Sequence, residues 1–295
     1  MVLSAPIRVA FRRVSGMRAF STSRAVADNL SFQVFGPENE QAMRKPIVFL
    51  HGLFGSKQNN RSISRVLARD LKCQIYTVDL RNHGHSFHST EHNYTAMAED
   101  VEEFIDQQKL GQCVLIGHSM GAKAAMTVAL RSPSLVSALI PVDNAPVSAP
   151  LKGDFGAYIR GMEHIEAERV MSQSSADKIL QDYEESLPIR QFILTNLVRD
   201  EDGTMKFRIP VSVLGEALSE MSDFPYRDPS SVTYNGPTLF VRGTKSRYVG
   251  EETVPAIRRF FPRAQIVDVE AGHWLISENP ESFRQAVVKF LTESS

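Results

Sequence analysis

The chain has 295 residues, of which 42% are hydrophobic and 23% charged, a composition typical of a globular protein that can bury a substantial core. The formal net charge of −1 gives no electrostatic reason to expect a nucleic-acid partner. No run of 18 or more apolar residues occurs, so we expect no membrane-spanning helix.

Residues 1–27 differ in composition from the rest of the chain. They contain five arginines and several serines, and no acidic residue precedes Asp28. Such segments are typical of mitochondrial transit peptides, and the stretch Arg18–Ser23 resembles a two-step processing signal with cuts before Phe20 and before Asp28. We therefore predict a transit peptide over 1–27 and a mitochondrial protein, with the matrix as its compartment. A disordered basic tail is the alternative.

After Asp28 short apolar segments alternate with helical ones. Residues 31–36 alternate at period two, as a half-buried edge strand does. Buried parallel strands are predicted at 46–52, 74–80, 113–119, 138–144, 238–243 and 264–270. Helices are predicted at about 59–70, 94–109, 120–132, 249–261 and 280–293, the last with Asn279 as N-cap and Pro280 as first residue. This order predicts an α/β fold with a mostly parallel, doubly wound sheet.

Residues 147–225 interrupt the alternation. They contain several amphipathic stretches and no convincing strand, and they are too long for a plain loop. We predict that 28–146 and 226–295 form the α/β core and that 147–225 form a helical cap over one end of the sheet.

Cysteines and histidines give no strong sign of a metal or redox site. Cys73 and Cys113 stand where strands begin and are interpreted as small core residues. Four histidines crowd one loop without the spacing of metal ligands, so we favour a polar loop over a metal site: His83, His85, His88 and His92. We expect neither a metal nor a bound organic cofactor.

The segment Gly117-His118-Ser119-Met120-Gly121 carries the first sign of chemistry. This G-x-S-x-G pattern follows an apolar strand and opens a helix of small residues, which is the strand–turn–helix context of a nucleophile elbow. The glycines keep the sharp turn free of side chains, so that the Ser119 hydroxyl is presented at the carboxyl end of the sheet. A tight turn without chemistry is the alternative.

Two further segments supply the groups that a serine nucleophile needs. The glycine-rich turn at 49–56 exposes backbone amides, and we assign the oxyanion donors to the N–H groups of Leu53 and Met120. His273 follows a strand and an Ala-Gly turn late in the chain, where this order of elements puts the general base. A simple strand-to-helix turn is the alternative for 49–56.

These elements together resemble the α/β-hydrolase superfamily over residues 30–293. The turn at 78–86 matches the superfamily pattern D-x-R-x-x-G-x-S. The combination with 51–56, 117–123 and 271–275 resembles the branch that holds a small bacterial esterase, the mitochondrial α/β-hydrolase-domain protein eleven of animals and the yeast ethanol acetyltransferases. The resemblance implies an esterase or thioesterase that works through an acyl-enzyme and in some members transfers the acyl group to an alcohol.

The acid of the triad departs from the common pattern. Many superfamily members carry it in the turn after 238–243, where this chain has Ser246, which cannot supply an anion. Asp143 ends the preceding strand, close enough to serve a histidine on a neighbouring loop, and the branch named above places its acid there. We assign Asp143 as the acid and expect Ser246→Ala to be nearly silent. A turn-capping role for Asp143 is the alternative, with Asp223 or Asp228 then next in line.

The sequence therefore predicts a serine hydrolase of esters, thioesters or lipids with the triad Ser119, Asp143 and His273. Three alternatives stay open: an alcohol acyltransferase that uses acyl-CoA, a non-catalytic protein that binds a ligand or protects a client, and a dehalogenase or epoxide hydrolase. The last class uses an aspartate nucleophile, against which Ser119 argues. The acyl chain, the leaving group and the oligomeric state are not readable from the sequence.

Overall fold

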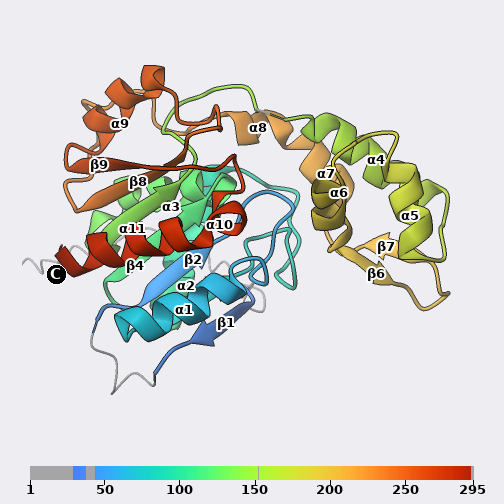
Figure 1. Ribbon diagram of the computed structural model, residues 1–295, viewed down its shortest axis with the longest axis horizontal. Coiled ribbons are helices and arrows are strands. Elements are labelled where there is room, and N and C mark those ends of the chain that lie inside the picture. Colours follow the sequence, from blue (N-terminus) through green and yellow to red (C-terminus); the bar gives the residue numbers. More distant parts are fainter. Residues whose placement is uncertain (1–28, 38–43, 152, 294–295) are drawn as a thin grey trace, which may run out of the picture.

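The computed structural model describes residues 29–37, 44–151 and 153–293, and the predicted transit peptide lies outside these residues. A seven-stranded sheet in the order β1-β3-β2-β4-β5-β8-β9 forms the core (Figure 1). Only the edge strand β1 is antiparallel to its neighbour, so the predicted mostly parallel α/β fold is confirmed. The strands are β1 Phe32–Phe35, β2 Ile47–Leu50, β3 Ile75–Val78, β4 Cys113–His118, β5 Val136–Val142, β8 Thr238–Gly243 and β9 Ala264–Val269.

Helices cover both faces of the sheet because its central strands are apolar on both sides. All residues of β2, β3 and β4 are buried. One face packs against α1 (Arg61–Leu71) and α11 (Pro280–Glu293), and the other against α2 (Tyr94–Gln107), α3 (Met120–Arg131) and α9 (Val254–Phe260). Three short helices complete the core: η2 (Pro133–Leu135), η3 (Glu251–Thr253) and α10 (Leu275–Glu278). No helix in the described ranges is long and apolar enough to cross a membrane.

Two details predicted from the sequence are confirmed in the core. Cys73 and Cys113 are buried free thiols, and burial raises the pKa of the Cys73 thiol to about 11. The first turn of α11 is capped by Asn279, whose Oδ1 accepts from the Ser282 N–H at 3.2 Å, with Pro280 as the first helical residue.

The segment between β5 and β8 forms a separate layer beyond the carboxyl ends of the strands (Figure 1). It contains five helices: α4 (Phe155–Ala167), α5 (Gln173–Leu180), α6 (Leu187–Leu194), α7 (Val211–Glu216) and α8 (Leu218–Ser222). It also contains an antiparallel pair, β6 (Leu197–Arg199) and β7 (Met205–Phe207), so the expectation of no strand here was wrong. The strands have three residues each, too short to show a period, but Asp202-Gly203 between them is a hairpin signal, and Gly203 has the positive φ of 87° that such a turn requires.

The two ends of this cap segment meet at one place on the core. The Ala149 N–H donates to the Ser222 carbonyl at 2.9 Å, which joins the segment's entry to its exit. The buried Lys123 ammonium of α3 donates to the carbonyls of Ser222 and Asp223, and the Tyr94 hydroxyl of α2 donates to the carbonyl of Met221. Two core helices therefore hold the exit of the cap.

Candidate active site

Ser119 stands in a sharp turn between β4 and α3. Its φ of 53° and ψ of −114° are a strained combination for a residue with a side chain. The turn depends on its glycines, because a Cβ on Gly117 would lie 2.1 Å from the carbonyl oxygen of Gly121, and a Cβ on Gly121 would lie 2.5 Å from that of His51. The strand–turn–helix expected from the sequence is thus present, with Ser119 at the carboxyl end of β4.

Ser119, His273 and Asp143 form one continuous line of hydrogen bonds. Ser119 Oγ lies 2.9 Å from His273 Nε2, and His273 Nδ1 lies 2.6 Å from Asp143 Oδ2. The carboxylate can only accept, so Nδ1 carries the proton and Nε2 is free to accept from the hydroxyl. The Asp143 side chain is fully buried, whereas that of His273 is 17% exposed. The carboxylate is therefore shielded from solvent, whereas the imidazole is partly exposed to it.

Sheet topology explains how Asp143 reaches His273. Asp143 follows β5 and His273 follows β9, and the one strand between them is β8. The β8 turn contributes two donors to the same carboxylate: the Gly243 N–H to Oδ1 at 3.1 Å and the Ser246 hydroxyl to Oδ2 at 2.5 Å. Ser246 thus has a partner that sequence reasoning did not foresee, and its position is occupied rather than vacated. The two alternative candidates for the acid have other partners. Asp223 accepts hydrogen bonds from Ser148 and Arg227, and Asp228 accepts one from the Ser230 N–H.

The loop after β2 lies against the serine turn and presents a free amide. The Gly52 carbonyl accepts from His51 Nδ1 at 2.8 Å. Because the C=O and N–H of a trans peptide point in opposite directions, this bond is one of the contacts that set the direction of the Leu53 N–H. Among the residues that the structure describes, neither that amide nor the Met120 amide donates to an internal acceptor. Both N–H groups remain available for an anionic oxygen.

Two more aromatic side chains hold the His273 loop. His118 Nε2 lies 2.8 Å from the His273 carbonyl oxygen, so its N–H donates to the backbone that carries the imidazole. Tyr248 stacks on the His273 ring at 4.1 Å between centroids. Asn144 donates from Nδ2 to the Ser119 carbonyl at 3.1 Å. Sequence reasoning missed all three, although two of them directly adjoin a predicted site residue in the chain.

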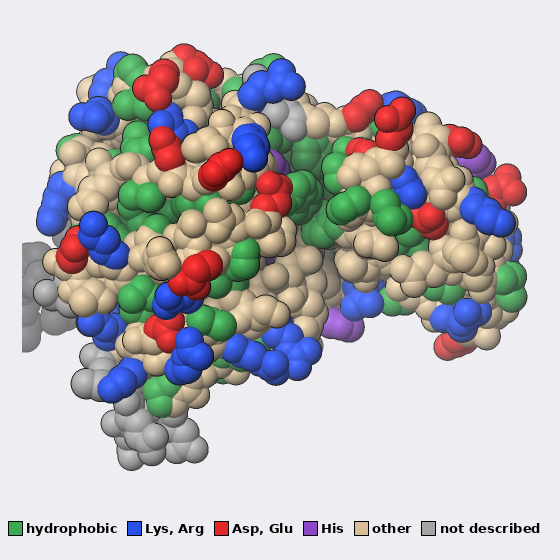
Figure 2. Space-filling model, in the orientation of Figure 1, with side chains coloured by type: hydrophobic (Ala, Val, Ile, Leu, Met, Phe, Trp, Pro, Cys, Tyr) green, Lys and Arg blue, Asp and Glu red, His purple; other side chains and the backbone are tan. Residues whose placement is uncertain are grey.

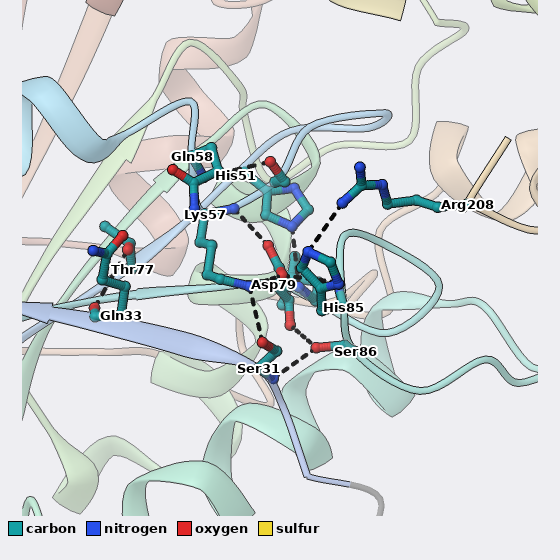
Figure 3. A network of polar contacts seen from close by, with 12 residues as sticks. Ser31, Gln33, His51, Lys57, Gln58, Thr77, Asp79, His85, Ser86 and Arg208 are labelled. Carbon is teal, nitrogen blue, oxygen red and sulfur yellow. Dashed lines mark hydrogen bonds and ion pairs between the residues drawn. The ribbon is translucent and has the colours of Figure 1, made fainter. Parts of the chain in front are cut away.

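A buried ion pair holds the end of the loop after β2 (Figure 3). The Lys57 ammonium pairs with Asp79, and the Lys57 backbone N–H donates to Asp79 Oδ1 at 2.6 Å. The His85 N–H donates to Asp79 Oδ2 at 2.9 Å, and Arg208 of the cap reaches His85 Nε2 at 3.0 Å. Asp79 therefore joins the turn after β2 to the turn after β3.

Buried histidines of these turns are neutral hydrogen-bonding groups. His51 Nε2 accepts from the Leu80 N–H and His83 Nε2 accepts from the Phe54 N–H, which requires a lone pair on each ring. Burial lowers the pKa of His51 and His83, and it lowers the pKa of His92 to about 4. Within the described residues no group of three histidine, cysteine or acidic side chains is arranged to hold a metal ion.

These neutral histidines predict a loss of stability in acid. The pKa of His92 is about 4 in the folded protein, so only the unfolded chain takes up its proton between pH 6.5 and 4, and stability falls as pH falls through that window. Over that window His92 lowers the unfolding free energy by about 1.4 kcal/mol per pH unit. Urea unfolding at a series of pH values gives the unfolding free energy as a function of pH. In His92→Phe the slope of that free energy against pH should be smaller by the contribution of one proton. An unchanged slope would contradict a neutral His92.

A cleft of about 810 Å³ adjoins the site between the core and the cap. His118 and Gly52 line it, and each is the chain neighbour of a predicted site residue. Phe192 of α6 meets Trp274, the residue after His273, with ring centroids 4.5 Å apart. Figure 2 shows hydrophobic side chains gathered in the hollow between the two layers. The cleft's large apolar residues are Ile63, Ile189, Phe192, Trp274 and Ile276.

Comparison with known proteins agrees with this architecture. The model of a protein family described as the alpha/beta hydrolase fold matches residues 45–280. The chain is a member of the α/β-hydrolase family. A solved structure, a marine microorganism esterase, is 31% identical and superposes with a TM-score of 0.83 over 90% of this chain and 100% of the esterase.

Curated relatives of this α/β hydrolase include a protein named as a lipase, one named as a probable acetyltransferase and one named for its domain alone. The sn-1-specific diacylglycerol lipase ABHD11 of Mus musculus is 42% identical over 83% of this chain and 80% of the lipase. A probable alcohol acetyltransferase of Saccharomyces cerevisiae is 39% identical over 86% of this chain and 79% of its own. An abhydrolase domain-containing protein of Schizosaccharomyces pombe is 36% identical over 85% of this chain and 93% of its own. The family, the relatives and the esterase together support a hydrolase enzyme.

Proposed function

We propose that this hydrolase cleaves carboxylic esters, including lipid esters or thioesters, through an acyl-enzyme on Ser119. The observation that carries the proposal is the unbroken line Ser119–His273–Asp143, with hydrogen bonds of 2.9 and 2.6 Å. Beside it lie two backbone amides that donate to no acceptor in the described part of the chain. The names of the lipase and esterase relatives support the substrate class. The mostly apolar cleft of about 810 Å³ is suited to an apolar substrate.

The first half of the reaction forms the acyl-enzyme. Ser119 Oγ bonds to the ester carbonyl carbon while its proton passes to His273 Nε2, and Asp143 stabilises the resulting imidazolium through Nδ1. The Leu53 and Met120 amides donate to the oxygen that becomes negative. As the tetrahedral intermediate collapses, the bond to the leaving oxygen or sulfur breaks, and His273 gives its proton to that atom.

In the second half, another nucleophile releases the acyl group. Water gives a proton to His273 and attacks the acyl carbon. As the second tetrahedral intermediate collapses, the bond to Ser119 Oγ breaks and His273 returns the proton to that oxygen. An alcohol in the same place would give an ester instead, and the acetyltransferase name among the relatives favours this as a second activity, with acyl-CoA as donor. Both outcomes use one serine and one base, so access of water or alcohol past the cap decides between them.

The test measures the acid and the ester product and identifies the serine that a covalent probe labels. Purified protein should hydrolyse p-nitrophenyl esters and react with a fluorophosphonate probe at Ser119. Ethanol should divert product from acid to ethyl ester without changing the labelled residue, and acyl-CoA should serve as donor if transfer is the main activity. Absence of labelling and turnover would leave the non-catalytic binding protein, and transfer that survives Ser119→Ala would require a second site.

We also propose that residues 1–27 direct the protein to the mitochondrial matrix and are then removed. The support is their five arginines and the absence of an acid before Asp28. N-terminal sequencing of protein isolated from the organelle should begin at Phe20 or Asp28. An intact Met1 on organellar protein, or a cytosolic fluorescent fusion, would contradict the proposal.

A further inference from the structure

We propose that Asn196, a residue of the cap, positions the oxyanion loop (residues 51–55) through Phe54 and so makes the oxyanion hole depend on the placement of the cap. The inference rests on the proposed function, because it assigns a role in the same chemistry. The contact that carries it joins residues 142 apart in the chain: Asn196 Nδ2 donates to the Phe54 carbonyl at 2.8 Å.

Phe54 needs to be held in place. Its φ of 61° is uncommon for a bulky residue, and its side chain is only 1% exposed. Its two backbone polar groups are bound from opposite layers of the molecule: the N–H donates to His83 Nε2 of the core at 3.1 Å, and the carbonyl accepts from Asn196 of the cap. Its ring packs against Phe155 of α4, with centroids 5.9 Å apart. Two of these three contacts therefore come from the cap.

Asn196 is suited to this role by its own surroundings. It is 2% exposed and lies between α6 and β6, where its backbone carbonyl accepts from the Arg208 N–H at 2.9 Å. Its side-chain amide also donates to the Ile193 carbonyl at 3.2 Å, which orients the NH₂ group toward the loop. The role requires a donor, so a side chain of the same shape without N–H groups cannot fill it.

Loss of this donor should act on the transition state. Without it the buried Phe54 carbonyl lacks a partner, and Phe54 can relax toward negative φ. Such a rotation re-aims the peptide units on either side of Leu53, whose N–H is the proposed oxyanion donor. The ester's ground state has little charge on its oxygen and depends less on that amide than the tetrahedral intermediate does. The defect should therefore appear in kcat and leave KM nearly unchanged.

The experiment compares Asn196→Asp, which keeps the shape and removes the donor, and Asn196→Ala with the matched control His85→Ala. The control breaks another hydrogen bond between cap and core, that between Arg208 and His85, which does not end on the oxyanion loop. Steady-state hydrolysis of a p-nitrophenyl ester and inhibition by an alkylboronic acid, which forms an anionic tetrahedral adduct on serine, are measured in each. Thermal unfolding identifies variants that do not fold. Two Asn196 variants are used so that one still tests the inference if the other does not fold.

We expect both Asn196 variants to lower kcat by about 10- to 100-fold, less than the loss of an oxyanion donor itself. The boronate inhibition constant should rise by the same factor, with KM within about twofold and His85→Ala close to wild type. A raised KM with unchanged kcat, an unchanged boronate constant, or Asn196 variants equal to the control would overturn the inference. If wild-type Ser119 is not labelled by a fluorophosphonate, the proposed function itself fails. If it is labelled and the Asn196 variants are unaffected, only this inference falls.

Discussion

Ser119→Ala should lower kcat by about 10⁶-fold, the loss that follows removal of the nucleophile from a serine hydrolase. In the proposed mechanism this serine supplies the atom that forms the acyl-enzyme, and its hydroxyl lies 2.9 Å from His273 Nε2. The residual rate over water would come from the oxyanion donors and substrate binding. Ester turnover and fluorophosphonate labelling of the purified variant measure the effect.

The matched control for this variant is Ser277→Ala. Ser277 lines the cleft beside the site, but it is exposed and its hydroxyl donates to the Trp274 carbonyl at 2.9 Å. Labelling should persist in the control and disappear in Ser119→Ala while both proteins fold. Turnover that persists in Ser119→Ala would show that the elbow is a structural turn and that another group carries the reaction.

Asp143→Asn should lower kcat by about 10⁴-fold with little change in KM. The asparagine amide can still meet Ser246 and Gly243, so the fold is expected to survive. It cannot accept from His273 Nδ1 with the same atom that donates to Ser246, and it stabilises no imidazolium. The imidazole would then adopt the wrong tautomer for accepting the Ser119 proton. Steady-state kinetics, with circular dichroism as a check on folding, measure the result.

Two companion variants complete this comparison. Asp228→Asn should keep wild-type kinetics, because its carboxylate is exposed and bonds Ser230. Ser246→Ala should now lower kcat by about tenfold, since its hydroxyl donates to the buried anion that orients His273. Wild-type turnover in a folded Asp143→Asn would mean that the acid lies elsewhere.

The fold was predictable because its signals are local. Buried strands such as β4 have no charged or strongly polar residue before Gly117, and α11 carries its Asn279 cap and Pro280 in the sequence itself. Gly117 of the elbow has an equally local reason, since a Cβ there would meet the backbone of Gly121. The β6–β7 pair was missed because strands of three residues are too short to display a period.

The surroundings of the site were less predictable because they join distant residues. Ser246 was expected to have no catalytic role, because serine cannot replace a carboxylate. In the structure its hydroxyl donates to Asp143, which lies 103 positions away in the chain. Nothing in the local sequence marks Asn196 as a partner of Phe54, or His118 as a donor to the His273 backbone. Such pairings depend on how the strand order and the cap bring loops together, which periodicity does not reveal.

The meeting of the cap's two ends has a consequence for how this protein can change. Because Ala149 bonds Ser222 where the chain leaves and re-enters the core, whatever lies between them is a closed excursion that does not alter the path of β5 or β8. The entropy cost of closing such an excursion grows only slowly with its length. We therefore expect exchanges, insertions and deletions within it to leave the sheet and the proposed catalytic residues in place, provided that they preserve the contacts of Asn196 and Phe155 with Phe54. New substrates can be explored by replacing one segment, while the chemistry is inherited unchanged.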